Sequence, residues 1–215
     1  MRVDPISPSS QVVRCAVRAI QNGGVVLSPT DTLYGFAVDP FQPSALRRLV
    51  EIKARPEEKG LLLLIPEVEW VEKFCDQRPP LFQALVEKLW PGAVTLLLKA
   101  GAGAAPPIAG KEGKVGFRIP RSPFLQAWME ALGGPLVSTS ANLSGEPPPR
   151  TVETLKELFS ARVDLFLEGG GSNQGQASTV LDLSAGFPRI IRRGACLKEV
   201  QSLLRRLGER PAGAP

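Results

Sequence analysis

The chain has 215 residues, and its 26 Lys and Arg residues against 21 Asp and Glu residues give a formal net charge of +5. It contains no histidine. That absence excludes Ser-His-Asp and Cys-His nucleophile systems, zinc sites that use imidazole, and any general base whose ordinary pKa lies near neutrality. With 43% hydrophobic and 22% charged residues, the composition is that of a folded protein, and the length favours one domain.

The cysteines and the N-terminus indicate the compartment. Cys15, Cys75 and Cys196 are odd in number and far apart, with no C-x-x-C pair, so neither a disulfide framework nor a cysteine metal site is expected. The N-terminal sequence lacks the features of a signal peptide, and the longest apolar runs, such as 61–66, are too short to cross a bilayer. We therefore expect a cytoplasmic protein without membrane contact.

Helix and strand signals alternate along the chain. In order they predict a helix that begins at Ser9 or Ser10 and ends before Gly23, a strand at 25–27, a helix at 43–53, a strand at 61–65, a helical stretch at 66–74, a helix at 80–90, and strands at 93–98 and 115–119. They continue with a helix at 124–132, a strand at 136–138, a helix at 151–159, strands at 163–167, 179–183 and 190–191, and a helix at 197–207. This interleaving predicts an α/β sheet with helices on its faces. The Gly- and Pro-rich segment 100–110 is expected to be a mobile loop outside the core.

Polar side chains gather where these elements end, which is where open α/β sheets bind ligands. The segment 29–35 (PTDTLYG) follows the first strand, although a turn or helix cap explains it equally well. Lys53 and Arg55 leave the second helix together, because Pro56 favours extended backbone at Arg55. Taken alone, that pair is better explained as cations that suit a helix C-terminus.

Two further polar groups follow later in the chain. The segment 138–145 (STSANLSG) offers neutral donors of the kind that a triphosphate or an amino acid carboxylate needs, with a capped polar turn as the alternative. Lys114 and Arg118 share one face of a predicted strand, so both can point at one anion. Ser178 and Arg192 extend this group. No Walker motif and no G-x-G-x-x-G sequence occurs.

Seven blocks follow one another between residues 23 and 195: PTDTLYG, KARPEEKGLLLLI, LWPGAVTLLL, KVGFRIP, PLVSTSANLSG, STVLD and IIRRGA. Together they resemble the YrdC-like threonylcarbamoyl-AMP synthase family, whose K-x-R and S-x-N signature appears as Lys53-Ala54-Arg55 and Ser140-Ala141-Asn142. The resemblance implies an open, twisted, mixed α/β sheet flanked by helices, with a basic concave active-site face. It also implies an enzyme that condenses L-threonine, bicarbonate or CO2, and ATP to threonylcarbamoyl-AMP and pyrophosphate for the t6A modification at adenosine 37 of tRNA.

The resemblance further implies roles for single residues. Lys53 and Arg55 would be catalytic, by neutralising the triphosphate. The positions that fall where the family binds L-threonine are Thr32, Arg118, Ser140 and Ser178. Those that fall where it binds ATP are Arg55, Lys59, Lys114, Asn142, Arg150 and Arg192. Mg²⁺ would enter with ATP, and no protein side chain is identified as its ligand. The implied partners also include a downstream threonylcarbamoyl-transferase complex.

The chain also departs from the family pattern. Leu64 stands where long members place a histidine near threonine, and Lys59-Gly60 stands where many members have Asn-Pro. The chain resembles the short form, with a catalytic domain over 1–207 and a loose tail over 208–215. Without histidine, the threonine ammonium must lose its proton to solvent, bicarbonate or phosphate, so the rate is expected to follow the threonine amine with pH.

Other functions stay open at this point. Residues 187–215 hold seven basic and two acidic residues, which could contact RNA or form a solvated helix face. The alternatives to the synthase are a YciO-like paralogue, a carbamoyl-transfer domain and an RNA-binding module. The polar segments are hydroxyl and amide clusters rather than Lys and Arg tracts interleaved with aromatic residues, which favours an enzyme. Nucleotidyl transfer depends on positioning and charge neutralisation, and those groups supply both.

Overall fold

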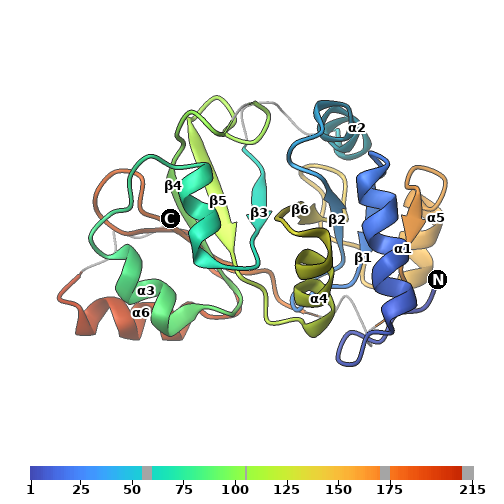
Figure 1. Cartoon of the computed structure of the whole chain (residues 1–215). Helices are drawn as coiled ribbons and strands as arrows, with labels where there is room; N and C mark the ends of the chain where they lie inside the picture. Colours follow the sequence, from blue (N-terminus) through green and yellow to red (C-terminus); the bar gives the residue numbers. More distant parts are fainter. Residues whose placement is uncertain (55–59, 105, 170–174, 210–215) are drawn as a thin grey trace.

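A computed structural model of the chain describes residues 1–54, 60–104, 106–169 and 175–209 (Figure 1). The helices are α1 (Ser10–Gln21), α2 (Pro43–Lys53), the 3-10 helix η1 (Val68–Lys73), α3 (Phe82–Leu89), α4 (Pro123–Leu132), α5 (Val152–Phe159) and α6 (Leu197–Arg206). The strands are β1 (Val26–Ser28), β2 (Gly35–Val38), β3 (Leu62–Leu64), β4 (Val94–Lys99), β5 (Lys114–Arg118), β6 (Leu136–Ser140), β7 (Leu165–Phe166), β8 (Thr179–Asp182) and β9 (Arg189–Arg192).

These strands form one mixed sheet in the order β7-β1-β2-β6-β3-β5-β4-β8-β9. The pairs β1–β7, β3–β5 and β4–β8 are parallel, and the other neighbours are antiparallel. The predicted α/β architecture, an open mixed sheet flanked by helices, is confirmed.

The two faces of the sheet are covered to different extents. On one face, residues such as Leu63 and Phe117 belong to a large apolar core that also takes in buried residues of α2, α3, α5 and α6. On the other face, a smaller cluster packs α1 and α4 against Val26, Ala37 and Leu136. Figure 1 shows α1 and α4 together in front of the sheet. Beyond them this second face is open, and it holds the site described below.

Side-chain caps fix several helix starts at the places that the sequence predicts. The Ser9 hydroxyl accepts a hydrogen bond from the Val12 N–H, and Thr151 caps α5 in the same way. At the other end of the chain, Gly208 adopts a left-handed backbone, and the Glu209 N–H donates to the Leu204 carbonyl. Residues 208 and 209 of the predicted tail thus help to end α6, and 210–215 lie outside the described residues.

Two expectations about elements are wrong. Residues 29–35 are expected to form a polar segment with no strand after it, whereas β2 begins at Gly35 and pairs with both β1 and β6. The segment 100–110 is not a loop outside the core. Within its described residues, Ala104, Ile108 and Ala109 are buried in the large core, and the Ile108 carbonyl accepts the Leu61 N–H.

Several predicted elements are shorter than expected. The stretch 66–74 contains the 3-10 helix η1 rather than an α-helix, and the strand predicted at 163–167 shrinks to β7. The three cysteines are free, and burial raises the pKa of the Cys75 thiol to about 12. Across the described ranges, no helix combines the length and the apolar character that crossing a membrane requires.

Candidate active site

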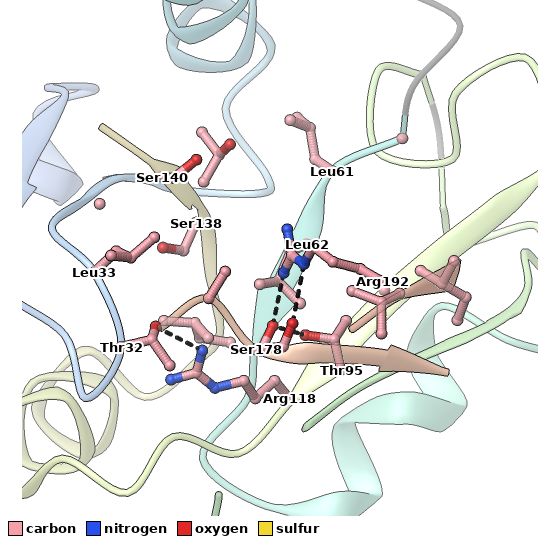
Figure 2. A pocket seen from close by; sticks show the side chains of 18 of the residues that line it. Thr32, Leu33, Leu61, Leu62, Thr95, Arg118, Ser138, Ser140, Ser178 and Arg192 are labelled. Atoms are coloured by element: carbon pink, nitrogen blue, oxygen red, sulfur yellow. Dashed lines mark hydrogen bonds between the residues drawn. The ribbon is translucent and has the colours of Figure 1, made fainter. Parts of the chain in front are cut away.

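The open part of the second sheet face forms a cavity of about 740 Å³ (Figure 2). Hydroxyl and amide groups line much of it: Thr30, Thr32, Thr95, Ser138, Thr139, Ser140, Asn142 and Ser178. The charged residues that line it are Glu112, Lys114, Arg118 and Arg192. Its apolar wall includes Leu33, Leu61, Leu62, Leu64, Leu97, Val180 and Ile191. This lining suits a ligand that carries anionic groups together with an apolar portion.

Two strand glycines keep the cavity floor low, one at the start of β2 and one in the middle of β5. Gly35 lies on β2 and Gly116 on β5, and both line the cavity. A Cβ atom at Gly116 would lie 3.1 Å from the Leu97 side chain and 3.3 Å from that of Thr95. Neither glycine has a positive φ, so it is the space above the strand that requires the absence of a side chain.

Arg118 lies at one end of this floor, at the end of β5. Its Nη1 donates to the Thr32 hydroxyl at 3.1 Å, and its Nη2 donates to the Asp31 carboxylate. The side chain is only 4% exposed. Burial, and then the nearby charge of Arg192, lower the pKa of Arg118 to about 10, so the guanidinium is cationic at neutral pH.

Arg192 reaches the same end of the cavity because β9 is irregular. Val180 pairs with Arg192 and Leu181 with Ile190, so Ile191 is an extra residue that bulges out of the ladder. The bulge turns both Ile191 and Arg192 toward the cavity. Arg192 Nε donates to the Ser178 carbonyl and Nη2 to the Ser178 hydroxyl, each at 2.9 Å. Burial lowers the pKa of Arg192 from its ordinary value.

Ser178 therefore lies at the centre of a small network (Figure 2). Its hydroxyl is 2.8 Å from the hydroxyl of Thr95, which comes from the neighbouring strand β4. Both residues are buried, with relative exposures of 3% and 4%. Because a buried hydroxyl without a partner is costly, Thr95 restricts the orientation of Ser178.

Lys114 lies at the other end of the floor, at the start of β5. Its Nζ is 3.0 Å from Asp182 Oδ2 and 3.3 Å from Glu112 Oε2. The hydrogen bond to Asp182 raises the pKa of Lys114. Burial alone would raise the pKa of Asp182, but hydrogen bonds from Ser184 and Lys114 lower it below its ordinary value. Lys114 is thus a fixed cation that is partly exposed to the cavity.

Lys53 lies beneath the cavity wall. It is 2% exposed, and its Nζ donates to the Ser140 carbonyl at 2.5 Å, to the Asn142 carbonyl at 2.8 Å and to Asn142 Oδ1 at 3.2 Å. Asn142 Oδ1 also accepts a hydrogen bond from the Ser140 hydroxyl. Lys53 itself is not among the residues that line the cavity. Its ammonium therefore holds the 140–142 segment in shape rather than facing a ligand.

The structure brings most of the predicted site residues together. Those that line the one cavity are Thr32, Lys114, Arg118, Ser140, Asn142, Ser178 and Arg192. Arg150 is described as exposed and is not part of the lining. Arg55 and Lys59 lie outside the described residues. The roles of all these residues stay predictions, whereas the placement of Lys114 and Arg118 on one strand face is confirmed.

Several residues that the sequence does not single out contribute to the site geometry. Asp31 and Asp182 each bond one of the cavity cations, Thr95 bonds Ser178, and Glu112 lies beside Lys114. The sequence marks Asp31 only by its place in a polar turn, and Thr95 lies in an apolar run. Their roles follow only from knowing which strands are neighbours.

The positions of the cations say what the cavity can bind. Lys114 and Arg118 are four residues apart on one strand, which places their Cα atoms about 13 Å from each other. Arg118 and Arg192 together outweigh the single charge of Asp31, so this end can accept one carboxylate. The Lys114 end can accept a second anion, such as a phosphate chain.

An open mixed sheet with this cavity defines an α/β protein with a candidate site for small anionic ligands. The family model Sua5_yciO_yrdC, described as "Telomere recombination", matches residues 18–194. The chain belongs to this Sua5/YciO/YrdC family.

Relatives with known names cover nearly the whole chain. A protein from Marinobacter nauticus named threonylcarbamoyl-AMP synthase is 33% identical over 184 residues, 85% of this chain and 97% of that protein. The crystal structure of P. abyssi Sua5 complexed with L-threonine matches with a TM-score of 0.90 and 28% identity over 100% of this chain, which spans 63% of the Sua5 chain. E. coli YciO matches with a TM-score of 0.82 and 27% identity, over 91% of this chain and 95% of its own.

Proposed function

We propose that the chain is a threonylcarbamoyl-AMP synthase, which condenses L-threonine, bicarbonate or CO2, and ATP to threonylcarbamoyl-AMP and pyrophosphate. One observation carries the proposal furthest: a single cavity holds two separated cationic ends on one face of β5, at Arg118 and Lys114. An amino acid and a nucleoside triphosphate need two such ends, with their reacting atoms between them. The Marinobacter nauticus relative supports this assignment by its name.

L-threonine is proposed to bind at the Arg118 end. Its carboxylate would pair with the guanidinium N–H groups that Thr32 and Asp31 leave free. The neighbouring hydroxyls of Thr32, Ser140 and Ser178 would bind the ammonium and hydroxyl groups. Leu64, the register partner of Arg118 on β3, offers an apolar wall for the threonine methyl group.

ATP is proposed to bind toward the Lys114 end. Lys114 would pair with the phosphates, Asn142 would contact the nucleotide, and Arg192, which lies at the Arg118 end, would contact the part of ATP nearest to threonine. Arg55, Lys59 and Arg150 are proposed to contribute further charge, as the family resemblance implies. Lys53 would act through the 140–142 segment that it holds, so it is proposed as a positioning residue rather than a direct partner of the triphosphate.

The proposed reaction depends on how the substrates are positioned, and it needs no basic side chain of the protein to accept a proton. The threonine nitrogen attacks CO2, or bicarbonate with loss of water, to give N-carboxythreonine and release a proton. The new carboxylate attacks the α-phosphorus of ATP, and the bond to the β-phosphate oxygen breaks to release pyrophosphate. With no histidine in the chain, the proton passes to solvent, bicarbonate or phosphate. Fixed cations stabilise the charge that builds up on the phosphates.

Mg²⁺ is proposed to arrive with ATP. Among the described lining residues Glu112 is the only acidic one, and no group of three or more Cys, Asp or Glu residues in the described ranges could hold a metal ion. This lining fits an ion that is held by phosphate oxygens and water, which is how proteins commonly bind Mg²⁺ with nucleotides. When bound, the ion would neutralise phosphate charge, while Lys114 and the hydroxyl groups position the chain of phosphates.

The protein is proposed to act in the cytoplasm, where it would supply the activated intermediate for tRNA t6A modification. Its product is a reactive mixed anhydride, so a downstream threonylcarbamoyl transferase must consume it. The free cysteines fit a reducing compartment. The basic residues near the C-terminus are proposed to contact RNA.

The decisive experiment is incubation of the protein with ATP, L-threonine and bicarbonate, followed by mass spectrometry of the adenylate and by a pyrophosphate assay. We expect product only when all three substrates are present. The Arg55→Ala variant should lower threonine-dependent pyrophosphate release by about 100-fold or more, by analogy with other arginines in phosphoryl transfer. The Lys53→Ala variant should lower it by about 100-fold or more as well, because the 140–142 segment loses the ammonium that holds it. Near wild-type release by both variants would contradict the assigned roles.

The match to E. coli YciO over 95% of its length makes a YciO-like activity the second candidate. A wild-type protein that binds ATP but forms no adenylate with threonine would favour it. An RNA-binding module would instead bind RNA without turnover and lose affinity steeply as salt rises.

A further inference from the structure

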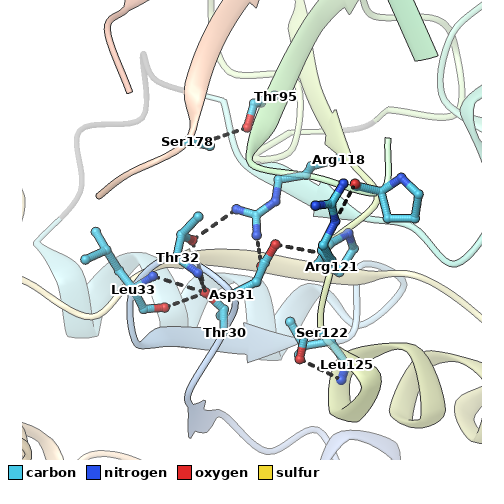
Figure 3. A network of polar contacts seen from close by, with 12 residues as sticks. Thr30, Asp31, Thr32, Leu33, Thr95, Arg118, Arg121, Ser122, Leu125 and Ser178 are labelled. Atoms are coloured by element: carbon cyan, nitrogen blue, oxygen red, sulfur yellow. Dashed lines mark hydrogen bonds and ion pairs between the residues drawn. The ribbon is translucent and has the colours of Figure 1, made fainter. Parts of the chain in front are cut away.

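Asp31 bridges the turn between β1 and β2 to the end of β5 and to the loop that follows it. It lies in the turn between β1 and β2, and its side chain is 10% exposed. One carboxylate oxygen accepts a hydrogen bond from Arg118 Nη2, and the other accepts the Arg121 N–H at 2.8 Å (Figure 3). Asp31 does not itself line the cavity. It therefore contacts Arg118 from behind, on the side away from the ligand space.

Arg118 depends on this contact for its orientation. A guanidinium carries five N–H donors, and only Nη1 and Nη2 have partners in the described part of the chain. Its Nε is buried and has no hydrogen-bond partner there. Thr32 supplies one neutral contact, so Asp31 is the only charged group that the structure shows bonded to Arg118. The bond to the Arg121 N–H keeps the carboxylate itself from rotating.

The same contact leaves the cavity side of the guanidinium available. Asp31 and Thr32 each take one N–H group, and the other N–H groups on the two Nη atoms stay available for a planar carboxylate. Asp31 also sets the charge at this end, because Arg118 and Arg192 together carry two positive charges against its one. The net charge of +1 that remains at this end matches the single negative charge of one carboxylate.

We propose that Asp31 is a positioning residue for the amino acid substrate, which orients the Arg118 guanidinium so that it binds the substrate carboxylate. This inference rests on the proposed function. It predicts that loss of the Asp31 charge weakens binding of the amino acid and leaves binding of the nucleotide unchanged, because Lys114 has its own partners at the far end of β5.

The test compares Asp31→Asn with wild type in two measurements: calorimetric affinity for L-threonine and for ATP, and the KM and kcat of product formation. We expect Asp31→Asn to weaken threonine binding about tenfold and to raise its KM to the same extent, as is typical for the loss of one charge-assisted hydrogen bond. ATP affinity and kcat should change less than about twofold. Asp39→Asn, in the loop after β2, is the matched control, because it loses only local bonds to Phe41 and Gln42.

A double-mutant cycle separates positioning from a general effect on folding. Asp31→Asn should cause no further loss of threonine affinity in an Arg118→Gln background, whereas an independent structural role would give additive losses. Asp31→Glu keeps the charge and should recover part of the affinity, and it also serves if Asp31→Asn does not fold. Equal losses for threonine and ATP, additive losses, or unchanged threonine affinity would each overturn the inference.

These outcomes also separate the inference from the proposed function. A wild-type protein that makes product, with unchanged threonine KM in Asp31→Asn, overturns only the inference. A wild-type protein that binds threonine and makes no product overturns the proposed synthase activity, and the calorimetry still decides the role of Asp31. If wild type binds no threonine at all, both are wrong.

Discussion

The same strands contribute to an apolar core in one half of a sheet face and to the candidate site in the other half. In the covered half, under α1 and α4, β2 presents Ala37 and β6 presents Leu136 to an apolar cluster. Two residues further along, the same faces of β2 and β6 present Gly35 and Ser138 to the cavity. A single strand thus changes from core to site within two residues, and its sequence changes from apolar to small or polar at the same point.

This difference predicts that substitutions in the two halves affect different measurements. In the covered half they should change the free energy of unfolding and leave substrate affinity alone. In the open half they should change affinity and leave stability nearly alone. The predictions below test that separation, from the largest expected effect to the smallest.

Leu136→Ala should lower the free energy of unfolding by about 3 kcal/mol, because it leaves a cavity among fully buried side chains. Urea denaturation measures this loss, and the KM values for threonine and ATP should stay unchanged. Ser138→Ala, two residues along the same strand, is the comparison and should cost less than about 1 kcal/mol. Equal stability losses for the two variants would remove the distinction between the halves.

Arg118→Gln should lower kcat/KM for threonine about 100-fold, equivalent to about 2.7 kcal/mol, because the substrate carboxylate loses its charged partner. Steady-state kinetics with threonine varied at saturating ATP measure the effect. Arg121→Gln is the matched control, since within the described residues its side chain donates to the exposed Pro91 carbonyl alone, and its N–H still reaches Asp31. A similar loss in Arg121→Gln would argue against a specific role for Arg118.

Gly116→Ala should raise the KM of at least one substrate about tenfold and change stability little. Its new methyl group would approach the side chains of Leu97 and Thr95 at 3.1 and 3.3 Å and occupy the cavity floor. Alanine fits a strand at least as well as glycine, so no loss of unfolding free energy is expected. An unchanged KM for both substrates would show that ligands do not reach the floor.

Thr95→Val should weaken threonine binding about threefold to fivefold, because it removes one hydroxyl partner from Ser178 and keeps the shape of the side chain. Calorimetric titration with threonine detects a change of this size. Valine is well suited to a strand, so stability should be preserved. Binding equal to wild type would mean that Arg192 alone is enough to orient Ser178.

The fold could be predicted from the sequence to the extent that each element shows its own pattern. The order of helices and strands follows from apolar runs and caps, such as Ser9 before α1. The strand β2 could not be found in this way, because its apolar part is short and its glycine serves the cavity. The prediction that segment 100–110 lies outside the core was wrong for a related reason. Its small residues permit close packing: a Cβ at Gly103 would lie 1.8 Å from the Lys73 carbonyl oxygen.

The site could be predicted residue by residue but not contact by contact. Alternation along β5 places Lys114 and Arg118 on one face, and the structure confirms it. Alternation along β9 would place Arg192 on the opposite face from Ile191, but the bulge brings both to the cavity. The pairing of Arg118 with Asp31 joins residues 87 positions apart, and no local pattern encodes such a pairing. The burial of Lys53 under residues 140–142 also depends on contacts between distant parts of the chain, so it could not be predicted from the sequence.

The two glycines on the cavity floor restrict how the cavity volume can change during evolution. Every amino acid replacement at Gly35 or Gly116 adds at least one carbon atom, so chance substitution at these positions can only make the cavity smaller. Without selection for ligand binding, substitutions at these two positions would therefore reduce the cavity volume from the side of the sheet. A related protein that retains both glycines is therefore expected to bind a ligand in this cavity, even if the charged residues around it differ.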